Sequence, residues 1–448
     1  MRRVASAFAV LIGLTAAGAS NAAESALADT GSQPPAAHPY SYAYDMFDNS
    51  LVRPTTRCLD IALLARKIAH HPREAANVDS ADQVRLPSTW WQPRLGFRPV
   101  TVAQILSGPG SGAGPVPGRW TVSHTKDQGV TPGFQIKDAA GGKFMIKFDP
   151  PGSPDLSTAA DVIGSHLFWA AGYNVPENVI ASFSLDSLDF AKDATYKDAQ
   201  GHKQPVTRAY VQELLTRVAR QADGRYRCSA SRFLEGKSLE AFEYRGRRAD
   251  DPEDLVPHEL RRELRGLWTL CAWTNHADSR GANSLDMWVT EDGRSFVRHH
   301  LIDFSALLGA GRNGKRAYPT GTEYYVDAGV MGRELVTLGL RPFTWERSVD
   351  PEIPSVGFVE SEVFDPAGWR PDYPNPAFDA RTDRDTRWGA RIVAGFSDEH
   401  IRALVATGHY TDPRAAEYLT RILIERRDKL VSRWLGASPR SSLLTAAP

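Results

Sequence analysis

The chain has few cysteines, no excess of charge of either sign, and no long apolar run after its first residues. Its three cysteines, Cys58, Cys228 and Cys271, are too few for a disulfide framework, and none has the Cys/His spacing of a zinc site. One bridge between Cys58 and Cys228 is compatible with an oxidising compartment, although sequence alone cannot pair them. Cys271 belongs to an apolar helical pattern, so we expect it to be buried.

Charge and hydropathy argue against two further classes of partner. The 53 basic and 53 acidic residues cancel, so no overall field favours nucleic acid or an acidic membrane. Beyond the first residues, no stretch is long and apolar enough to span a membrane. We therefore expect no nucleic-acid partner and no stable membrane insertion once the N-terminal segment has been cleaved.

The first 22 residues have the pattern of a secretory signal peptide. Arg2 and Arg3 supply positive charge, the run "VASAFAVLIGLTAAGA" is apolar, and Ser20 and Ala22 are small residues that permit cleavage. The run is too short and too rich in small residues to form a typical transmembrane helix. An uncleaved N-terminal anchor is the alternative. We predict an exported protein, periplasmic or secreted.

The front half of the chain predicts the order β-β-β-α-β. A loose lead and one helix, "TTRCLDIALLARKIAHH", come first, and three short β-like runs follow at 119–125, 133–138 and 143–149. Residues 154–176 then read as a helix with Ser157 as its N-cap and Gly172 as its stop, and a strand follows at 178–185.

The back half is mainly helical. Residues 257–273 predict a helix with Pro257 at its start, and 284–302 predict a hairpin around the turn Asp292-Gly293. Three capped helices near the end begin at Thr382, Ser397 and Asp412. The predicted class is α+β with two lobes, a small β-rich lobe with one helix and a larger helical lobe. The predicted segments are a signal peptide (1–22), an N-terminal extension (23–85), the small lobe (86–235), the large lobe (236–436) and a flexible tail (437–448).

The stretch "NHADSRGANSLD" carries the chemistry. It contains H-x-D-x-x-x-x-N, formed by His276, Asp278 and Asn283, and the predicted hairpin folds Asp303 back toward Asn283. Phosphoryl transfer from ATP requires one carboxylate to orient an acceptor hydroxyl, and a second carboxylate with an amide oxygen to hold Mg²⁺. The alternative is that these are loop residues that cap their own backbone, with Asp303 an ordinary carboxylate at a strand end.

This arrangement of helix, loop, hairpin and Asp303-Phe304 resembles the catalytic core of protein-kinase-like enzymes, in which H-R-D-x-x-x-x-N precedes D-F-G. In such a core a strand lysine binds phosphates, and Lys147 stands at a position facing away from Ile146 and Phe148. A solvated strand lysine is the alternative.

Three further parts of a nucleotide site follow from this resemblance. Asp161, on the predicted helix, would be the carboxylate paired with Lys147, with Asp155 or Glu177 as alternatives. The loop "HTKDQGVTPGF" would cover phosphates, and a bare hairpin turn is equally compatible with it. In "SRFLEGKSL" the chain would pass between the lobes, and Gly236 would allow it to turn. The residues expected to bind nucleotide are Lys126, Gly129, Gly133, Lys147, Asp161, Leu234 and Glu235.

Two local features, "KFD" at Lys147 and "AAGYNVPENVI" after the helix, resemble the atypical group that includes HipA-type and CotH-type kinases. The likeness covers about residues 86–436. It implies a bilobal kinase-like fold, an ATP site, Mg²⁺ held by Asn283 and Asp303, and Asp278 as catalytic base. The chain departs from the family where Ser305 replaces the glycine of D-F-G, and no A-P-E-like peptide anchor follows. The acceptor is therefore open.

The predicted function is an exported phosphotransferase that uses ATP and Mg²⁺ to phosphorylate a hydroxyl-bearing acceptor. A catalytically inactive, kinase-like binding module of the cell envelope is one alternative, and a nucleotidyl transferase with the same residues is another. Lys147, Asp278, Asn283 and Asp303 are all present, which favours catalysis. The acidic cluster "RRADDPEDL" (247–255) is either a divalent-ion or acceptor site, or a solvated loop.

Overall fold

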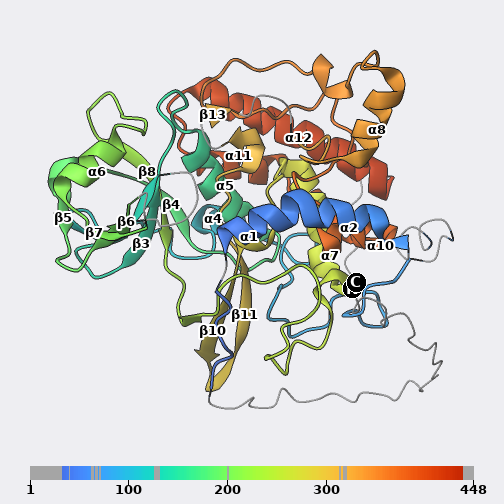
Figure 1. The fold of residues 1–448 in the computed structure, drawn as a ribbon, viewed down its shortest axis with the longest axis horizontal. Coiled ribbons are helices and arrows are strands. Elements are labelled where there is room, and N and C mark those ends of the chain that lie inside the picture. The colour runs from blue at the N-terminus through green and yellow to red at the C-terminus, as the bar shows by residue number, and fades with distance from the viewer. Residues whose placement is uncertain are drawn as a thin grey trace, which may run out of the picture.

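A computed structural model describes residues 33–39, 41–61, 65, 69, 72–125, 132–198, 201–311, 314–315 and 320–436. The predicted signal peptide and C-terminal tail lie outside these residues, as do Lys126 and Gly129. The described chain has a sheet-containing lobe beside a larger helical lobe, with helix α5 between them (Figure 1). The predicted bilobal α+β class is confirmed.

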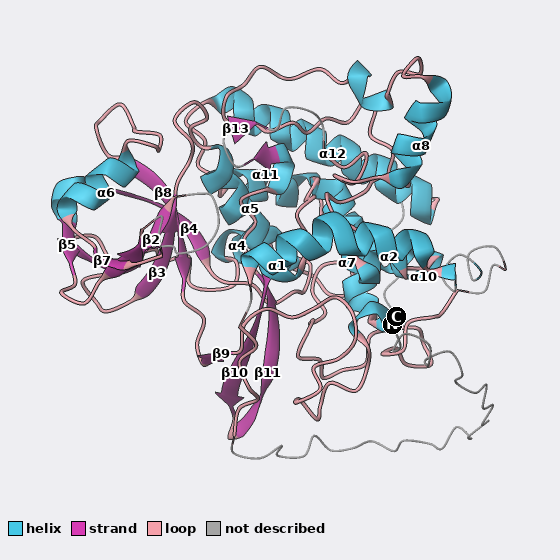
Figure 2. Ribbon diagram, viewed as in Figure 1, coloured by secondary structure: helices cyan, strands magenta, loops and turns pink. Residues whose placement is uncertain are grey.

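The small lobe is built on a six-stranded sheet of order β4-β8-β3-β2-β1-β5 (Figure 2). The predicted succession of three strands, a helix and a strand is present. Neighbouring strands are antiparallel except for the parallel pair β1 and β5. These elements are β1 (Trp120–Thr125), β2 (Gly133–Lys137), β3 (Lys143–Lys147), α5 (Leu156–Ala170), β4 (Asn178–Phe183), β5 (Leu188–Phe190) and β8 (Tyr226–Arg232).

An insertion between β4 and β8 was not predicted from the sequence. It forms β5, β6 (Thr195–Lys197), β7 (Lys203–Pro205) and α6 (Arg208–Leu215). Val211, Leu214 and Leu215 of α6 pack into the same apolar core as the sheet. The insertion therefore completes the small lobe, whose core the first strands alone do not fill.

Helix α5 does not begin with the cap that the sequence predicted. Ser157 lies inside the first turn, and the helix begins after Asp155, whose own side chain makes no capping bond. Instead, the Asp149 carboxylate accepts hydrogen bonds from the backbone N–H groups of Asp155 (3.0 Å) and Thr158 (2.8 Å). The prediction of Ser157 as N-cap is wrong because a residue at the end of the preceding strand bonds the exposed N–H groups.

The large lobe contains the predicted helix, hairpin and three C-terminal helices. Thr382, Ser397 and Asp412 each cap their helix through the side chain, as predicted. Helix α7 begins later than predicted, because residues after Pro257 form a short 3₁₀ turn, His258–Leu260. The elements are α7 (Arg262–Thr274), β10 (Ser284–Glu291), β11 (Arg294–Leu301), α8 (Ala328–Thr337), α9 (Pro376–Asp379), α10 (Asp383–Ala394), α11 (Asp398–Ala406) and α12 (Pro413–Leu435), with the two-residue strands β9 (Lys237–Ser238), β12 (Ala310–Gly311) and β13 (Gly314–Lys315).

The chain before β1 packs with the large lobe. Helix α1 (Tyr42–Phe47), a π-helical turn (Asp48–Val52) and α2 (Arg53–Leu59) lie along its face (Figure 1). Trp90 and Trp91 are buried in the large-lobe core, and so is Ile105 of helix α4 (Val102–Ser107). These residues share an apolar core with α7 and α10 of the large lobe.

The cysteines show no bridge in the described part of the chain. Cys228 and Cys271 are free and fully buried, so the bridge considered between Cys58 and Cys228 is not formed. Burial raises the pKa of the Cys228 thiol to about 12 and that of Cys271 above its usual value. Among the described residues, no helix combines the length and apolar character needed to cross a membrane.

Buried Arg426 of α12 holds the end of α7. The loop that follows, residues 275–283, carries His276, Asp278 and Asn283 and is called the H-x-D loop below. Its guanidinium donates to the carbonyl oxygens of Ala272 (2.6 Å), Trp273 (2.8 Å) and Glu360 (2.6 Å). It also stacks on Phe364 at 3.5 Å. Burial lowers the pKa of Arg426 to about 9. The bonds to three carbonyl oxygens hold this side chain in the core.

We expect Arg426→Met to lower the free energy of unfolding by about 3 kcal/mol, because buried carbonyl groups lose their donor. Urea denaturation measures this as a lower midpoint. The matched control is Arg421→Met on the same helix, where Arg421 is exposed and pairs with Glu425 at 3.2 Å. Such a surface pair contributes about 0–1 kcal/mol, so equal losses in both variants would contradict the assigned role.

Candidate functional site

The ammonium group of Lys147 is the centre of the site. Ile146 and Phe148 face the sheet core, and Lys147 therefore points to the opposite side, toward α5 and the end of β11. Its Nζ lies 3.3 Å from Asp161 Oδ1 and 3.0 Å from Asp303 Oδ1. Burial by itself lowers the pKa of Lys147, but the two carboxylates outweigh it and raise the pKa above its ordinary value. Lys147 is therefore a fixed positive charge.

Asp161 of α5 is the carboxylate that reaches Lys147. It is fully buried, and it also accepts hydrogen bonds from Ser229 Oγ (2.9 Å) and from the backbone N–H of Phe304 (3.0 Å). The two alternatives are engaged elsewhere, Asp155 with Arg227 at 3.0 Å and Glu177 with Arg232 at 2.7 Å. Asp161 thus joins β3, β8 and the segment after β11 in one buried network.

Asp303 and Asn283 are brought together at the base of the hairpin. Ile302 N–H donates to Asn283 O at 3.0 Å, so the residue before Asp303 is bonded directly to Asn283. Asp303 has the left-handed φ of 58°, and Ser305 Oγ donates to its Oδ1 at 2.6 Å. Asp is one of the few residues other than Gly that adopt the left-handed backbone, and here its carboxylate lies against Lys147.

Side chains of the H-x-D loop make contacts within the loop itself. Asn283 Nδ2 donates to the backbone oxygen of Asp278 at 2.6 Å, so a cation at Asn283 would be held by its amide oxygen. Asp278 Oδ1 forms an ion pair with Arg280 Nε at 2.7 Å, and its side chain is 22% exposed. A carboxylate and an amide oxygen are hard donors of the kind that Mg²⁺ prefers, so Asp303 and Asn283 fit this ion chemically.

Phe304 fixes the segment that carries Asp303. Its ring is fully buried, stacks on Phe168 of α5 at 5.0 Å and 13°, and lies 5.9 Å from the His276 ring. Gly164 of α5 faces Phe304 so closely that an added Cβ would collide with the Phe304 side chain. His276 therefore supports the site through packing.

Of the remaining predicted nucleotide-binding residues, Gly133 lies beside Lys147, Leu234 and Glu235 follow β8, and Lys126 and Gly129 lie outside the described residues. Gly133 begins β2 and is the strand partner of Lys147. Leu234 packs against Met287 and neighbouring apolar residues of the hairpin, and Glu235 is exposed. Gly236 has a φ of 98°, and a Cβ there would collide with Trp288 O, so this turn requires glycine.

Several residues that contact Asp161, Asp303 or Phe304 were not predicted from the sequence. Ser229 and Ser305 bond the two carboxylates, and Gly164 admits Phe304. Ser229 stands 68 residues from Asp161, so no spacing signal could have linked them. Arg280 lies inside the motif itself, where its charge next to Asp278 was the available signal.

The acidic cluster at 247–255 is part of a packed network. Arg248 pairs with Asp286 at 3.2 Å, and Asp254 pairs with His258 and Arg261 at 2.7 Å each. Among the described residues, no group of three or more His, Cys, Asp or Glu side chains could hold a metal ion. The cluster therefore binds the hairpin to the loop before α7.

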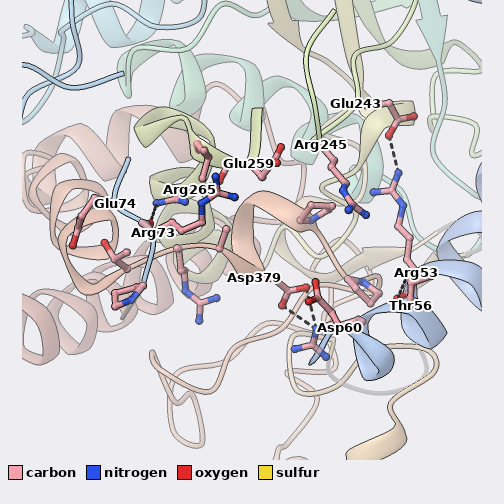
Figure 3. Close-up of a pocket in the computed structure, with 18 of the residues that line it drawn as sticks. Arg53, Thr56, Asp60, Arg73, Glu74, Glu243, Arg245, Glu259, Arg265 and Asp379 are labelled. Atoms are coloured by element: carbon pink, nitrogen blue, oxygen red, sulfur yellow. Dashed lines mark hydrogen bonds and ion pairs between the residues drawn. The ribbon is translucent and has the colours of Figure 1, made fainter. Parts of the chain in front are cut away.

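A large cavity lies apart from these residues (Figure 3). Its volume is about 1220 Å³, and it is bordered by α2, α9 and the loop around Glu243. Arg53–Glu243 and Arg57–Asp379 ion pairs cross its lining. None of the predicted site residues lines it.

Comparison with known proteins gives structural likenesses only. No family model and no curated protein matches the chain. It is similar to the proinflammatory kinase CtkA of Helicobacter pylori, with 13% identity, 70% of this chain and 95% of that chain covered, and a TM-score of 0.36. It is also similar to the Golgi casein kinase with Mn/ADP bound, with 10% identity, 72% of this chain and 75% of that chain covered, and a TM-score of 0.31. A third similar structure is hydra Fam20 with sugar, with 11% identity, 70% of this chain and 88% of that chain covered, and a TM-score of 0.27.

We expect Gly164→Ala to destabilise the protein by about 1–3 kcal/mol, because the new methyl group overpacks the contact with Phe304. Chemical denaturation measures the loss. Gly152→Ala is the matched control, since a Cβ at Gly152 meets nothing within 4 Å. If both variants unfold at the wild-type midpoint, the close packing of α5 on Phe304 does not hold.

Proposed function

We propose that the chain is an ATP-dependent phosphotransferase that phosphorylates a hydroxyl group. The observation that carries this proposal is the buried ammonium of Lys147 between Asp161 and Asp303, with Asn283 bonded to the residue before Asp303. Phosphoryl transfer needs these charges at fixed mutual positions, and the described contacts supply them from three separate elements.

Each residue has a distinct task in this proposal. Lys147 binds and neutralises the phosphates that are not transferred, and Asp161 keeps its ammonium in place. Asn283 and Asp303 would hold Mg²⁺, which when bound neutralises charge on the phosphate oxygens. Leu234 and Glu235 would contact the nucleotide base through their backbone, and Lys126, Gly129 and Gly133 would lie over the phosphates.

Asp278 is the base for the acceptor. The acceptor oxygen forms a bond to the γ-phosphorus, the bond from that phosphorus to the bridging oxygen of ADP breaks, and ADP leaves. The acceptor proton passes to the Asp278 carboxylate. The partial exposure of Asp278 is compatible with access for a hydroxyl group.

The place of action is also part of the proposal. The signal-like pattern of residues 1–22 supports export to the periplasm or beyond, and the resemblance to HipA-type and CotH-type kinases supports an atypical member of the kinase-like group. An exported kinase requires ATP outside the cytoplasm, for example at an encounter beyond the cell.

We expect ATP with Mg²⁺ to raise the thermal unfolding midpoint of residues 23–448, since a ligand of the folded state stabilises it. At a hundredfold excess over Kd the gain is about 2.7 kcal/mol. The rise should need Mg²⁺ and should be lost in Asp303→Asn, measured by differential scanning fluorimetry.

Asp292→Asn is the matched control for that experiment. Asp292 has a φ of 51°, close to the 58° of Asp303, but stands in the hairpin turn away from Lys147. Its ligand-induced shift should equal that of the wild type. Absence of a shift in a well-folded wild type at millimolar ATP would contradict a nucleotide site and favour a binding module.

We expect Asp278→Asn to lower turnover by about 10²- to 10⁴-fold, because the amide cannot accept the acceptor proton. Release of ADP from ATP with Mg²⁺ measures turnover, with water as the acceptor. The thermal shift caused by ATP should remain, since Asp278 does not bind the phosphates. Turnover at the wild-type rate would exclude Asp278 as the base.

A further inference from the structure

The N-terminal helical segment, residues 41–59, runs across the large lobe (Figure 1), and its helix α1 contacts the loop that carries Asp278 through Asp45 and Arg280. Two ion pairs fix this segment to the large lobe, Arg53 with Glu243 at 2.7 Å and Arg57 with Asp379 at 3.0 Å. Arg57 also lies over the Tyr324 ring at 4.7 Å. Both anchoring residues belong to α2, so these contacts fix α2 to the large lobe.

Asp45 of α1 reaches into that loop and pairs with Arg280. Asp45 is buried, and Asn49, one turn later, donates to Asp45 Oδ1 at 2.7 Å and to its backbone oxygen at 2.8 Å. Asn49 is itself only 1% exposed. The carboxylate that faces Arg280 is therefore held in one orientation.

Arg280 is enclosed on several sides. Its guanidinium contacts Asp45 and Asp278, lies 5.3 Å from the centre of the Tyr373 ring, and has Met46 Sδ 3.7 Å from Nη1. The planar guanidinium contacts two carboxylates through different nitrogens: Nη1 donates a hydrogen bond to Asp45, and Nε lies 2.7 Å from Asp278 Oδ1 as an ion pair. One fixed carboxylate thereby determines the position of the other.

We propose that Asp45 is a positioning residue for the base: it holds Arg280 so that Arg280 Nε keeps Asp278 Oδ1, leaving Oδ2 to receive the acceptor hydroxyl. Asp278 Oδ1 is buried, while the side chain retains its partial exposure. The N-terminal segment is thus a working part of the acceptor side of the site. This inference rests on the proposed phosphotransferase function.

A neighbouring acidic residue distinguishes positioning from general support of the helix. Asp48 belongs to the same segment but pairs with Arg53 of that segment. Asp45→Asn and Asp48→Asn are therefore matched substitutions, one bonded to the H-x-D loop and one not. Asn at position 45 keeps the shape of Asp and can still accept from Asn49, so the helix is expected to fold.

The test measures ATP hydrolysis with Mg²⁺ and amide hydrogen exchange of residues 276–283 in the full mature chain. We expect Asp45→Asn to lower kcat by roughly ten- to a hundredfold with KM for ATP unchanged, because misplacement of a catalytic group has effects of this order. Exchange in 276–283 should become faster. Asp45→Glu, which keeps the charge, should recover part of kcat, and Asp48→Asn should match the wild type.

Two outcomes would overturn the proposal. A kcat for Asp45→Asn equal to that of the wild type, with unchanged exchange, would show that Asp45 does not position the base. A higher kcat would show that α1 restrains the site. If the wild type neither binds nor hydrolyses ATP, the phosphotransferase function fails. Hydrogen exchange then tests the contact between Asp45 and the H-x-D loop by itself: faster exchange in Asp45→Asn supports this contact, and unchanged exchange rejects it.

Discussion

The buried ammonium of Lys147 is the constraint on which the two lobes depend. A charge removed from water is stable only when it is paired, and the partners of Lys147 come from two other elements, Asp161 from α5 and Asp303 from the segment after β11. The pairing therefore ties the sheet of the small lobe to the hairpin of the large lobe. Loss of either carboxylate would leave part of a buried charge uncompensated.

The packing around this pairing makes it rigid. Phe304 lies between α5 and His276, so the residue after Asp303 is fixed by ring contacts as well as by its N–H bond to Asp161. Arg426 bonds the end of α7, where the H-x-D loop begins. The two loops that supply Asp278, Asn283 and Asp303 are thus held from the core side.

The N-terminal segment adds a second set of charges from the opposite side. Asp45 and Arg280 extend the network from Asp278 to α1, and the ion pairs of Arg53 and Arg57 continue along the cavity of Figure 3. Residues that precede the first strand therefore belong to the large lobe and to the acceptor side of the proposed site.

Local sequence patterns sufficed to predict the strands and helices outside the insertion between β4 and β8, the three C-terminal caps, the hairpin turn at Asp292-Gly293, and the orientation of Lys147 away from the sheet core. These depend on periodicity and on side chains within a few residues, which a single sequence records directly. The hairpin also sufficed to predict that Asp303 lies near Asn283. Three contacts could be known only from the folded chain: Asp161 rather than Asp155 or Glu177 meets Lys147, Asp149 caps α5 in place of Ser157, and Asp45 faces Arg280. Those contacts join segments that are placed by the packing of whole helices and sheets, and burial there leaves no pattern in the neighbouring residues.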